Sequence, residues 1–375
     1  MARTLLGPKS SAMDYVFVSL LVVLVVFGLV MLTTASTELS KTKFNDSAYY
    51  LKHQLLVGIL PGIVGFLIGY FVYYRTWEKF APYLLMFGIV TLLLVFIPAL
   101  SSAAKGAQRW VDIGGFSFQP GEFVKLTFFI FLAAWISRGQ QRGKNFWGGL
   151  VPFSVLIGLV VLLLLMQPAT STAGLIFLTS LIVYFTSGAK IRFVAALILI
   201  ACLGLITLVI FSPFSSSSYR MERITTFLNG GADTSDKGYH INQAQLAIGA
   251  GGLFGVGFGQ STTKLHLPEP MGDSIFAVMG EELGFVGAIT FLLVYLTFIW
   301  RGLRVARHAA DNFGRYLATS FMSLFALQAF VNIGAISGVI PMTGVPLPFI
   351  SYGGTAIFVF LTMCGIIANI SKYHR

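Results

Sequence analysis

Residues 14–36 read DYVFVSLLVVLVVFGLVMLTTAS, an apolar run in which Asp14 is the only charged residue. A helix needs about 20 consecutive apolar residues to cross the hydrocarbon core of a bilayer. Together with the preceding MARTLLGPKS, this run also has the form of a secretory signal sequence. Because apolar runs of similar length recur to the end of the chain, a first membrane-spanning helix is the better interpretation.

The composition agrees with a protein that lies in lipid. Hydrophobic residues make up 56% of the 375 residues and charged residues only 10%, whereas soluble domains carry about 25% charge. The pattern predicts an all-α, polytopic integral membrane protein with about ten transmembrane helices. The spans are expected at residues 14–36, 52–73, 81–99, 122–137, 148–166, 172–187, 191–212, 274–300, 314–338 and 351–370. They leave no room for a separate soluble domain, so residues 1–375 are expected to form a single transmembrane domain.

The basic residues are distributed unequally between the two sides of the membrane. Lys and Arg in short loops resist translocation and stay cytoplasmic. With the N-terminus inside, the cytoplasmic side holds Arg3, Lys9, Arg75, Lys79, Arg138, Arg142, Lys144, Lys190, Arg192, Arg301, Arg304, Arg307, Arg315, Lys372 and Arg375. The outer loops and span edges hold Lys41, Lys43, Lys52, Lys105 and Arg109. Both termini are therefore expected to be cytoplasmic.

The one long connection between predicted spans, residues 213–273, would then be a large extracytoplasmic loop. Connections of this length are usually functional or disordered. Its first half, through SPFSSSSYRMERITTFLNGGADTSDKGYH, is polar and rich in turn residues, which favours contact with solvent. Its second half begins INQAQLAIGAGGLFGVGFGQ and is apolar and glycine-rich, so we expect it to fold back against the helices.

The net charge of +11 does not indicate a nucleic-acid partner, because the basic residues are scattered through the loops between spans. Anionic lipids and head groups explain them better. Cys202 and Cys364 both lie inside apolar runs, where a thiol usually behaves as a small hydrophobe. The sequence contains no GxGxxG, GxxxxGK[ST], HExxH or CxxC motif, its five histidines are dispersed, and no nucleophilic triad can be assembled. We predict no disulfide framework and no metal site.

Acidic residues gather around the start of the predicted span 274–300. Asp273 falls where this helix should begin, and an Asp at that position commonly caps the free backbone N–H groups of the first turn. Glu281 and Glu282 follow about 12 Å further along the helix. Ionisable groups at membrane depth are costly unless they are paired or face a polar cavity. At least one of the two glutamates should therefore meet a basic or hydrogen-bonding partner, and residues 105–129 offer candidates.

Within 105–129, Glu122 and Lys125 are three residues apart and share one face of a helix. They could form a self-satisfied ion pair, or they could belong to a site. Lys105 and Arg109 come shortly before them, at the expected outer surface. Arg109 lies beside Trp110 and could simply anchor the membrane interface, but with Lys105 it also suits a phosphate or pyrophosphate group.

A proline-rich segment interrupts the last part of the chain. Residues 332–358 read NIGAISGVIPMTGVPLPFISYGGTAIF, with prolines at 341, 346 and 348. This stretch cannot be one continuous helix. Irregular backbone at membrane depth is tolerated only against protein or a water-filled cavity, so the segment is expected to help wall a cavity.

Three stretches in this order resemble the SEDS family (shape, elongation, division and sporulation proteins), typified by FtsW and RodA. They are KGAQRWVDIGGFSFQPGEFVKL at 105–126, NQAQLAIGAGGLFGVGFGQSTTKLHLPEPMGDSIFAVMGEELGFVGA at 242–288, and NIGAISGVIPMTGVPLPFISYGG at 332–354. The resemblance implies a peptidoglycan glycosyltransferase that polymerises the glycan of lipid II at the outer face of the bacterial cytoplasmic membrane. It also implies a class B penicillin-binding protein as partner, along with other division proteins.

The resemblance assigns roles to individual residues. Asp273 matches the catalytic acid residue of the family, and Glu122, Lys125 and Arg109 match its motif positions. The chain departs from the family pattern at Gly121, which replaces Ser, at 271–272, which read Met-Gly instead of His-Thr, and at Ala169, which replaces an acid. A second acidic site at position 169 is thereby lost.

On this basis the chemistry can be outlined. Asp273 is expected to act as general base towards an acceptor hydroxyl. Lys105, Arg109 and Lys125 are expected to bind the leaving pyrophosphate. The expected supports are Glu122, Glu281 and Glu282. A divalent cation could share the pyrophosphate, although no motif requires one. The run 14–36 is more similar to FtsW than to RodA, which favours a role in cell division. An elongation polymerase of the RodA type and a flippase or transporter for lipid-linked precursors are the alternatives.

Overall fold

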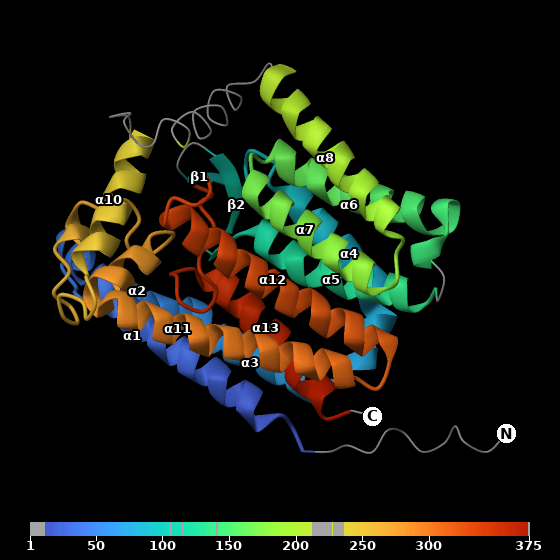
Figure 1. Cartoon of the computed structure of the whole chain (residues 1–375), viewed down its shortest axis with the longest axis horizontal. Coiled ribbons are helices and arrows are strands. Elements are labelled where there is room, and N and C mark those ends of the chain that lie inside the picture. Colours follow the sequence, from blue (N-terminus) through green and yellow to red (C-terminus); the bar gives the residue numbers. More distant parts are fainter. Residues whose placement is uncertain are drawn as a thin grey trace.

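The structure is a computed structural model that describes residues 12–104, 107–114, 116–139, 142–211, 227 and 236–373. Long helices run side by side and dominate it (Figure 1). The helices are α1 (Tyr15–Phe44), α2 (Tyr49–His53), α3 (Leu60–Phe71), α4 (Tyr74–Leu94), α5 (Pro120–Ser137), α6 (Val151–Met166), α7 (Thr170–Thr186), α8 (Ile191–Phe211), α10 (Asp236–Ala250), α11 (Ile275–His308), α12 (Asn312–Ile336) and α13 (Gly354–Ser371). The predicted positions Lys105, Arg3, Lys9 and Arg375 lie outside the described residues, as does most of 212–235.

Short elements extend or join these helices. A π-helical turn, η1 (Gln54–Ile59), links α2 to α3 without a break, and another, η3 (Phe146–Leu150), precedes α6. Single 3₁₀ turns, η2 (Arg142–Lys144) and η4 (Thr263–Leu265), lie in connections. The strands β1 (Ser101–Ala104), β2 (Ala107–Ile113) and β3 (Phe116–Phe118) form a small antiparallel sheet in the order β1-β2-β3.

The prediction of an all-α polytopic membrane protein is confirmed. Among the described residues, eight helical segments are long and apolar enough to cross a membrane. The helix α7 and the first part of α8 are apolar but shorter, so the count of ten spans stays a prediction. Most boundaries agree within a few residues, but α4 begins at Tyr74 rather than at 81, because the polar residues RTWEK form its first turns. The helix α10 and the sheet were not predicted.

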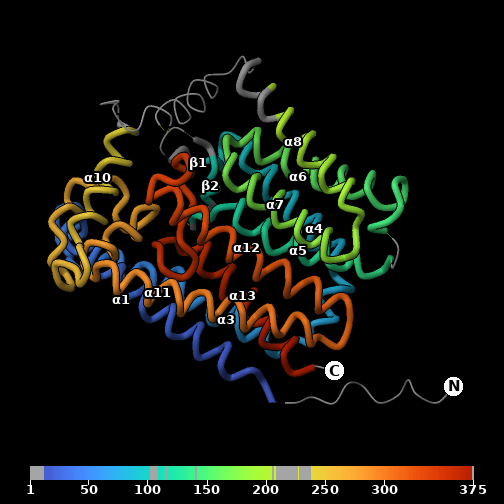
Figure 2. The backbone as a smooth tube through the Cα atoms, viewed as in Figure 1, coloured from blue at the N-terminus to red at the C-terminus, as the bar shows by residue number. Residues whose placement is uncertain are grey.

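Burial separates central helices from peripheral ones. In α13, 89% of an 18-residue stretch is buried, against 22% in α4. The helices α5, α12 and α13 are the most buried spans, and α12 and α13 run through the middle of the view in Figure 2. Other helices, such as α4, expose large apolar side chains, as a lipid-facing surface requires. In α3 and α13, glycines bring the two backbones close together: a Cβ on Gly365 would come 2.2 Å from the carbonyl oxygen of Phe66. Small residues at helix contacts are a common means of packing in membranes.

One end of the bundle collects basic residues and ion pairs. Arg301 near the end of α11 binds Asp14 before α1 at 2.8 Å. Arg75, at the start of α4, pairs with Asp311 before α12. The backbone N–H of Asp14 donates to Ser371 at the end of α13. The starts of α1, α4 and α12 and the ends of α11 and α13 therefore meet at this end, which we call the basic end.

The helix α11 is broken where the predicted span 274–300 should be continuous. Gly284 has φ 67° and ψ −168°, a conformation that only glycine adopts easily. The glycine-rich loop 251–260 packs at this break: the N–H of Phe285 donates to Gly252 at 2.9 Å, and the N–H of Val256 donates to Glu281. The expectation that this half of the long connection folds back against the helices is confirmed.

The close approach of α3 and α13 generates a prediction. Substitution Gly365→Ala should lower the free energy of unfolding by about 1–3 kcal/mol, because the new methyl group has no room beside Phe66. Gly158→Ala on α6 is the matched control, since nothing lies within 4 Å of its added Cβ and Ala favours a helix over Gly. Thermal unfolding of the purified protein in detergent measures both. Equal melting temperatures for the two variants would contradict the packing account.

Candidate active site

Asp273 lies on the segment that leads into α11, and this segment is fixed by its backbone. The carbonyl oxygens of residues 271–273 each accept one hydrogen bond. They come from the backbone N–H of Tyr352 at 2.8 Å, the hydroxyl of Ser351 at 2.7 Å and the side-chain amide of Asn332 at 2.8 Å. Three successive carbonyls are thus held by α12 and by the residues just before α13. The position of the half-buried Asp273 is set by main-chain contacts.

The expectation that Asp273 is the N-cap of its helix is wrong by one position. The helix α11 starts at Ile275, and Ser274 occupies the cap position. The Ser274 hydroxyl donates to the carbonyl of Pro268 at 2.8 Å, and its oxygen lies 2.6 Å from Nε2 of His240. Asp273 lies one residue before this cap, close to the positive end of the helix dipole.

The segment between α12 and α13 provides these contacts and has no regular structure, as its prolines predict. Its residue Leu347 donates its N–H to the Ser351 hydroxyl at 2.8 Å. Its carbonyls at Val345 and Pro346 accept from Asn332 and Gln328 of α12, at 2.7 Å and 3.0 Å. The irregular backbone is therefore satisfied by buried amide side chains, as membrane depth requires. Its predicted role as a cavity wall stays a prediction.

A second contact ties this segment to the π-helical turn η1. The N–H of Gly353 donates to the Gln54 side chain at 3.1 Å, and the Tyr352 hydroxyl lies 2.7 Å from Nδ1 of His53. π-helical turns are often found at functional sites.

Glu122 and Lys125 form a buried ion pair. Their charged groups are 2.7 Å apart, and both side chains are at most 5% exposed. The Lys125 ammonium also donates to Gln328 at 3.0 Å and lies 5.1 Å from the centre of the Phe360 ring. Because Gln328 in turn holds Pro346, the pair connects α5 through α12 to the segment beside Asp273. The ammonium points at buried partners, so the geometry favours a positioning role for Lys125 over the predicted direct contact with substrate.

Arg109 lies on β2 of the small sheet. The sheet pairs Ser102 with Trp110 and Val111 with Phe118. A guanidinium nitrogen of Arg109 donates to the carbonyl of Pro168, in the turn between α6 and α7. After the sheet, the N–H of Gln119 donates to Thr355 at the start of α13. Arg109 is therefore held at the end of the bundle opposite the basic end, where the Asp273 segment also lies.

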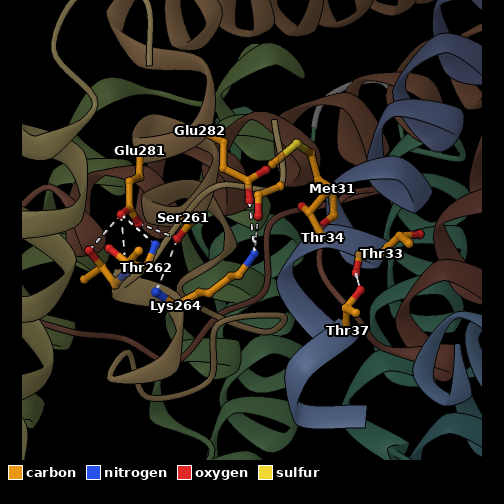
Figure 3. A network of polar contacts seen from close by, with 11 residues as sticks. Met31, Thr33, Thr34, Thr37, Ser261, Thr262, Lys264, Glu281 and Glu282 are labelled. Atoms are coloured by element: carbon orange, nitrogen blue, oxygen red, sulfur yellow. Dashed lines mark hydrogen bonds and ion pairs between the residues drawn. The ribbon is translucent and has the colours of Figure 1, made fainter. Parts of the chain in front are cut away.

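The buried carboxylates of Glu281 and Glu282 are met differently: Glu281 by hydrogen bonds, Glu282 by one cation (Figure 3). The Glu281 carboxylate accepts from the Ser261 hydroxyl, the N–H groups of Thr262 and Thr263, and the Thr263 hydroxyl. Glu282 lies 3.6 Å from the ammonium of Lys264. The prediction of basic or hydrogen-bonding partners is confirmed. The expectation that these partners come from residues 105–129 is wrong. They come from residues 261–264, because the loop before α11 folds back onto this helix.

Sequence reasoning missed Lys264, Gln328, Asn332 and Ser351. The two amides gave a signal, since Gln328 and Asn332 are four residues apart in an apolar helix and so share one face. The sequence carried no such signal for Lys264, because Lys264 meets Glu282 only once the loop before α11 has folded back onto this helix. Among the described residues, no group of three or more His, Cys, Asp or Glu side chains is arranged to hold a metal ion.

Comparison with known proteins agrees with this architecture. The model of the FtsW/RodA/SpoVE family of cell cycle proteins matches residues 14–375. Stage V sporulation protein E of Bacillus subtilis (strain 168) is 37% identical over 98% of this chain and 99% of its own length. A probable peptidoglycan glycosyltransferase FtsW of Geobacter sp. (strain M18) is 36% identical over 96% of this chain and 97% of its own.

Solved structures have the same fold. A chain from a structure on the coordination of polymerization and crosslinking by a peptidoglycan synthase complex matches with a TM-score of 0.79 and 25% identity. It covers 97% of this chain and 99% of its own. The rod shape determining protein RodA of Thermus thermophilus matches with a TM-score of 0.69, at 24% identity, over 96% of this chain and 97% of its own. The fold and the site thus define a multi-pass membrane protein with a polar centre at one end of its bundle. The chain belongs to the FtsW/RodA/SpoVE family.

The ion pair between Lys264 and Glu282 generates a prediction. Lys264→Met leaves a fully buried carboxylate without its cation, so the free energy of unfolding should fall by about 3–5 kcal/mol. The double substitution Lys264→Met/Glu282→Leu should recover most of that loss, because no buried charge remains. Thermal unfolding in detergent gives the comparison.

The matched control is Lys41→Met, which removes a cation from the exposed pair with Glu38 at 3.9 Å. Exposed pairs contribute little, so its melting temperature should stay close to that of the unchanged protein. If Lys264→Met melted at the same temperature as Lys41→Met, the pair would have no structural importance.

Proposed function

We propose that the chain is a peptidoglycan glycosyltransferase that polymerises lipid II, with Asp273 as its general base. The observation that carries this proposal is the Asp273 segment: a half-buried carboxylate on a backbone held by three hydrogen bonds, away from the basic end. Relatives that share 36–37% of the sequence over nearly its whole length carry the name of this activity.

The reaction can be written for these residues. A hydroxyl of the acceptor sugar attacks the anomeric carbon of the donor, and a new glycosidic bond forms. The bond from that carbon to the pyrophosphate oxygen breaks, and its electron pair leaves with the lipid pyrophosphate. Asp273 takes the proton of the hydroxyl. Positioned general bases contribute roughly 10²–10⁴-fold to such rates.

The leaving pyrophosphate needs positive charge. Arg109 supplies a planar guanidinium that suits phosphate oxygens, and Lys105 is the second cation that the sequence places nearby. The ion pair of Glu122 and Lys125 would act indirectly. Through Gln328 it would hold the segment between α12 and α13, which fixes the Asp273 backbone. The prenyl tails would lie against the exposed apolar side chains between peripheral helices.

The membrane orientation follows from charge. The basic end would face the cytoplasm, with both termini there, because cytoplasmic loops carry the excess of Lys and Arg. The Asp273 segment and Arg109 would then lie at the outer face of a bacterial cytoplasmic membrane, where lipid-linked precursors are joined. A flippase or transporter would concentrate its key groups near the membrane midplane, so their position at one end supports the enzyme over the transporter.

The relatives also suggest partners and a cellular role. One similar chain comes from a peptidoglycan synthase complex, which supports a class B penicillin-binding protein as the transpeptidase partner. The similarity to FtsW and to a sporulation protein supports septal synthesis during division, with other division proteins as further partners. RodA-type elongation is the alternative role.

The substitution Asp273→Asn tests the proposal. Asn keeps the size of the side chain and the backbone carbonyl that Asn332 holds, but it cannot take a proton, so glycan synthesis should fall at least a hundredfold. The measurement is a gel assay of glycan chains made from lipid II by the purified protein, with and without its partner.

The matched control is Glu269→Gln, a neutralised acid on the same segment, which should retain most of the activity. Lipid II binding and the melting temperature of Asp273→Asn should stay close to those of the unchanged protein. Substantial glycan synthesis by Asp273→Asn would rule out the proposed role of Asp273.

A further inference from the structure

A cavity of about 370 Å³ lies at the basic end, far from the site described above. It is bordered by the turns η2 and η3 on one side and by the start of α8 on the other. Its lining residues are Lys144, Asn145, Phe146, Lys190, Arg192 and Phe193. Three cations and two aromatic rings therefore face one space, with one amide and no acid among them.

The cations of this cavity differ from other cations at the basic end. Arg75, Arg138 and Arg301 each lie in an ion pair with a nearby acid. Within the described part of the chain, Lys144, Lys190 and Arg192 have no such ion pair. Residues 123–221 contain no Asp or Glu, so the stretch that carries these cations offers them no acid of its own. Among the described residues these three groups are therefore available to an anion from another molecule.

The cavity is held in shape by tight contacts. The N–H of Lys190 donates to the carbonyl of Gly143 at 3.2 Å, which joins the two sides. A Cβ on Gly143 would lie 2.8 Å from the backbone of Ala189, so only glycine allows this approach. The Asn145 side chain accepts from the N–H groups of Trp147 and Gly148, which fixes the start of η3. The basic groups are thus brought together by a preformed scaffold.

The rim of the cavity is apolar and exposed. Trp147 is 78% exposed, and Phe146 and Ile191 are also exposed. The Arg192 guanidinium and the Lys190 ammonium lie 5.4 Å and 5.8 Å from the centre of the Phe193 ring. An exposed tryptophan beside basic groups at the end of a membrane helix is typical of the level of lipid head groups.

We propose that this cavity binds the phosphate group of an anionic glycerophospholipid from the leaflet at the basic end. The three cations match a phosphodiester, and Trp147, Phe146 and Ile191 lie where its glycerol and first acyl carbons would be. Basic pockets between membrane helices are known to take such head groups. The apolar rim favours a lipid over free phosphate, and the site is independent of the proposed polymerase reaction.

Native mass spectrometry of the full chain in neutral detergent tests this site. Titration with dioleoyl phosphatidylglycerol should give one tightly retained lipid, and dioleoyl phosphatidylcholine should give none. The triple variant Lys144→Gln/Lys190→Gln/Arg192→Gln should bind phosphatidylglycerol about a hundredfold more weakly.

The matched control is Lys79→Gln/Arg307→Gln/Arg315→Gln, which removes the same charge from exposed positions at the basic end but outside this cavity. It should bind phosphatidylglycerol like the unchanged protein. An equal loss in the control would mean that only the general surface charge matters and would overturn the proposal. Equal retention of phosphatidylcholine, or displacement of the lipid by inorganic phosphate at a similar concentration, would overturn it too.

Discussion

A buried charge in an apolar bundle must find its partners inside the protein, and the site depends on how this chain meets that constraint. The ammonium of Lys125, 1% exposed, is neutralised by Glu122 and bound by Gln328. Gln328 also holds the irregular segment after α12, and that segment holds the carbonyls beside Asp273. A chain of connected polar groups thus runs from the first turns of α5 to the segment of the proposed general base. Breaking one link would leave a buried charge or amide unpaired, which is costly.

The entry into α11 follows the same constraint. Glu281 and Glu282 would be unfavourable in a straight lipid-exposed helix, but the break at Gly284 lets the preceding loop pack against them. Glu281 then accepts from residues 261–263, and Glu282 faces Lys264. These contacts fix residues 261–264, which lead into the segment that carries Asp273. The two glutamates therefore hold the approach to this segment, while Asn332, Ser351 and Tyr352 hold its carbonyls.

Most of the fold could be predicted from the sequence, because long apolar runs have few ways to exist outside a membrane helix. The three-residue spacing of Glu122 and Lys125 places them on one helix face and indicated that they could pair. The position of Glu281 and Glu282 at membrane depth indicated that they need partners. The identity of those partners depends on loop geometry: Lys264 meets Glu282 only because the chain turns back at 251–260. The break at Gly284 and the sheet that carries Arg109 were also hidden, since glycine is common in membrane helices and the strands are short.

We propose that the pair of Glu122 and Lys125 acts on catalysis by positioning, through Gln328. The decisive measurement is a double-mutant cycle on glycan synthesis from lipid II, using Glu122→Gln, Lys125→Met and both together. Each single substitution should lower kcat with little change in KM, and the double substitution should cost no more than the larger single one. Losses that multiply, or a rise in KM confined to Lys125→Met, would contradict it and assign Lys125 to the substrate instead.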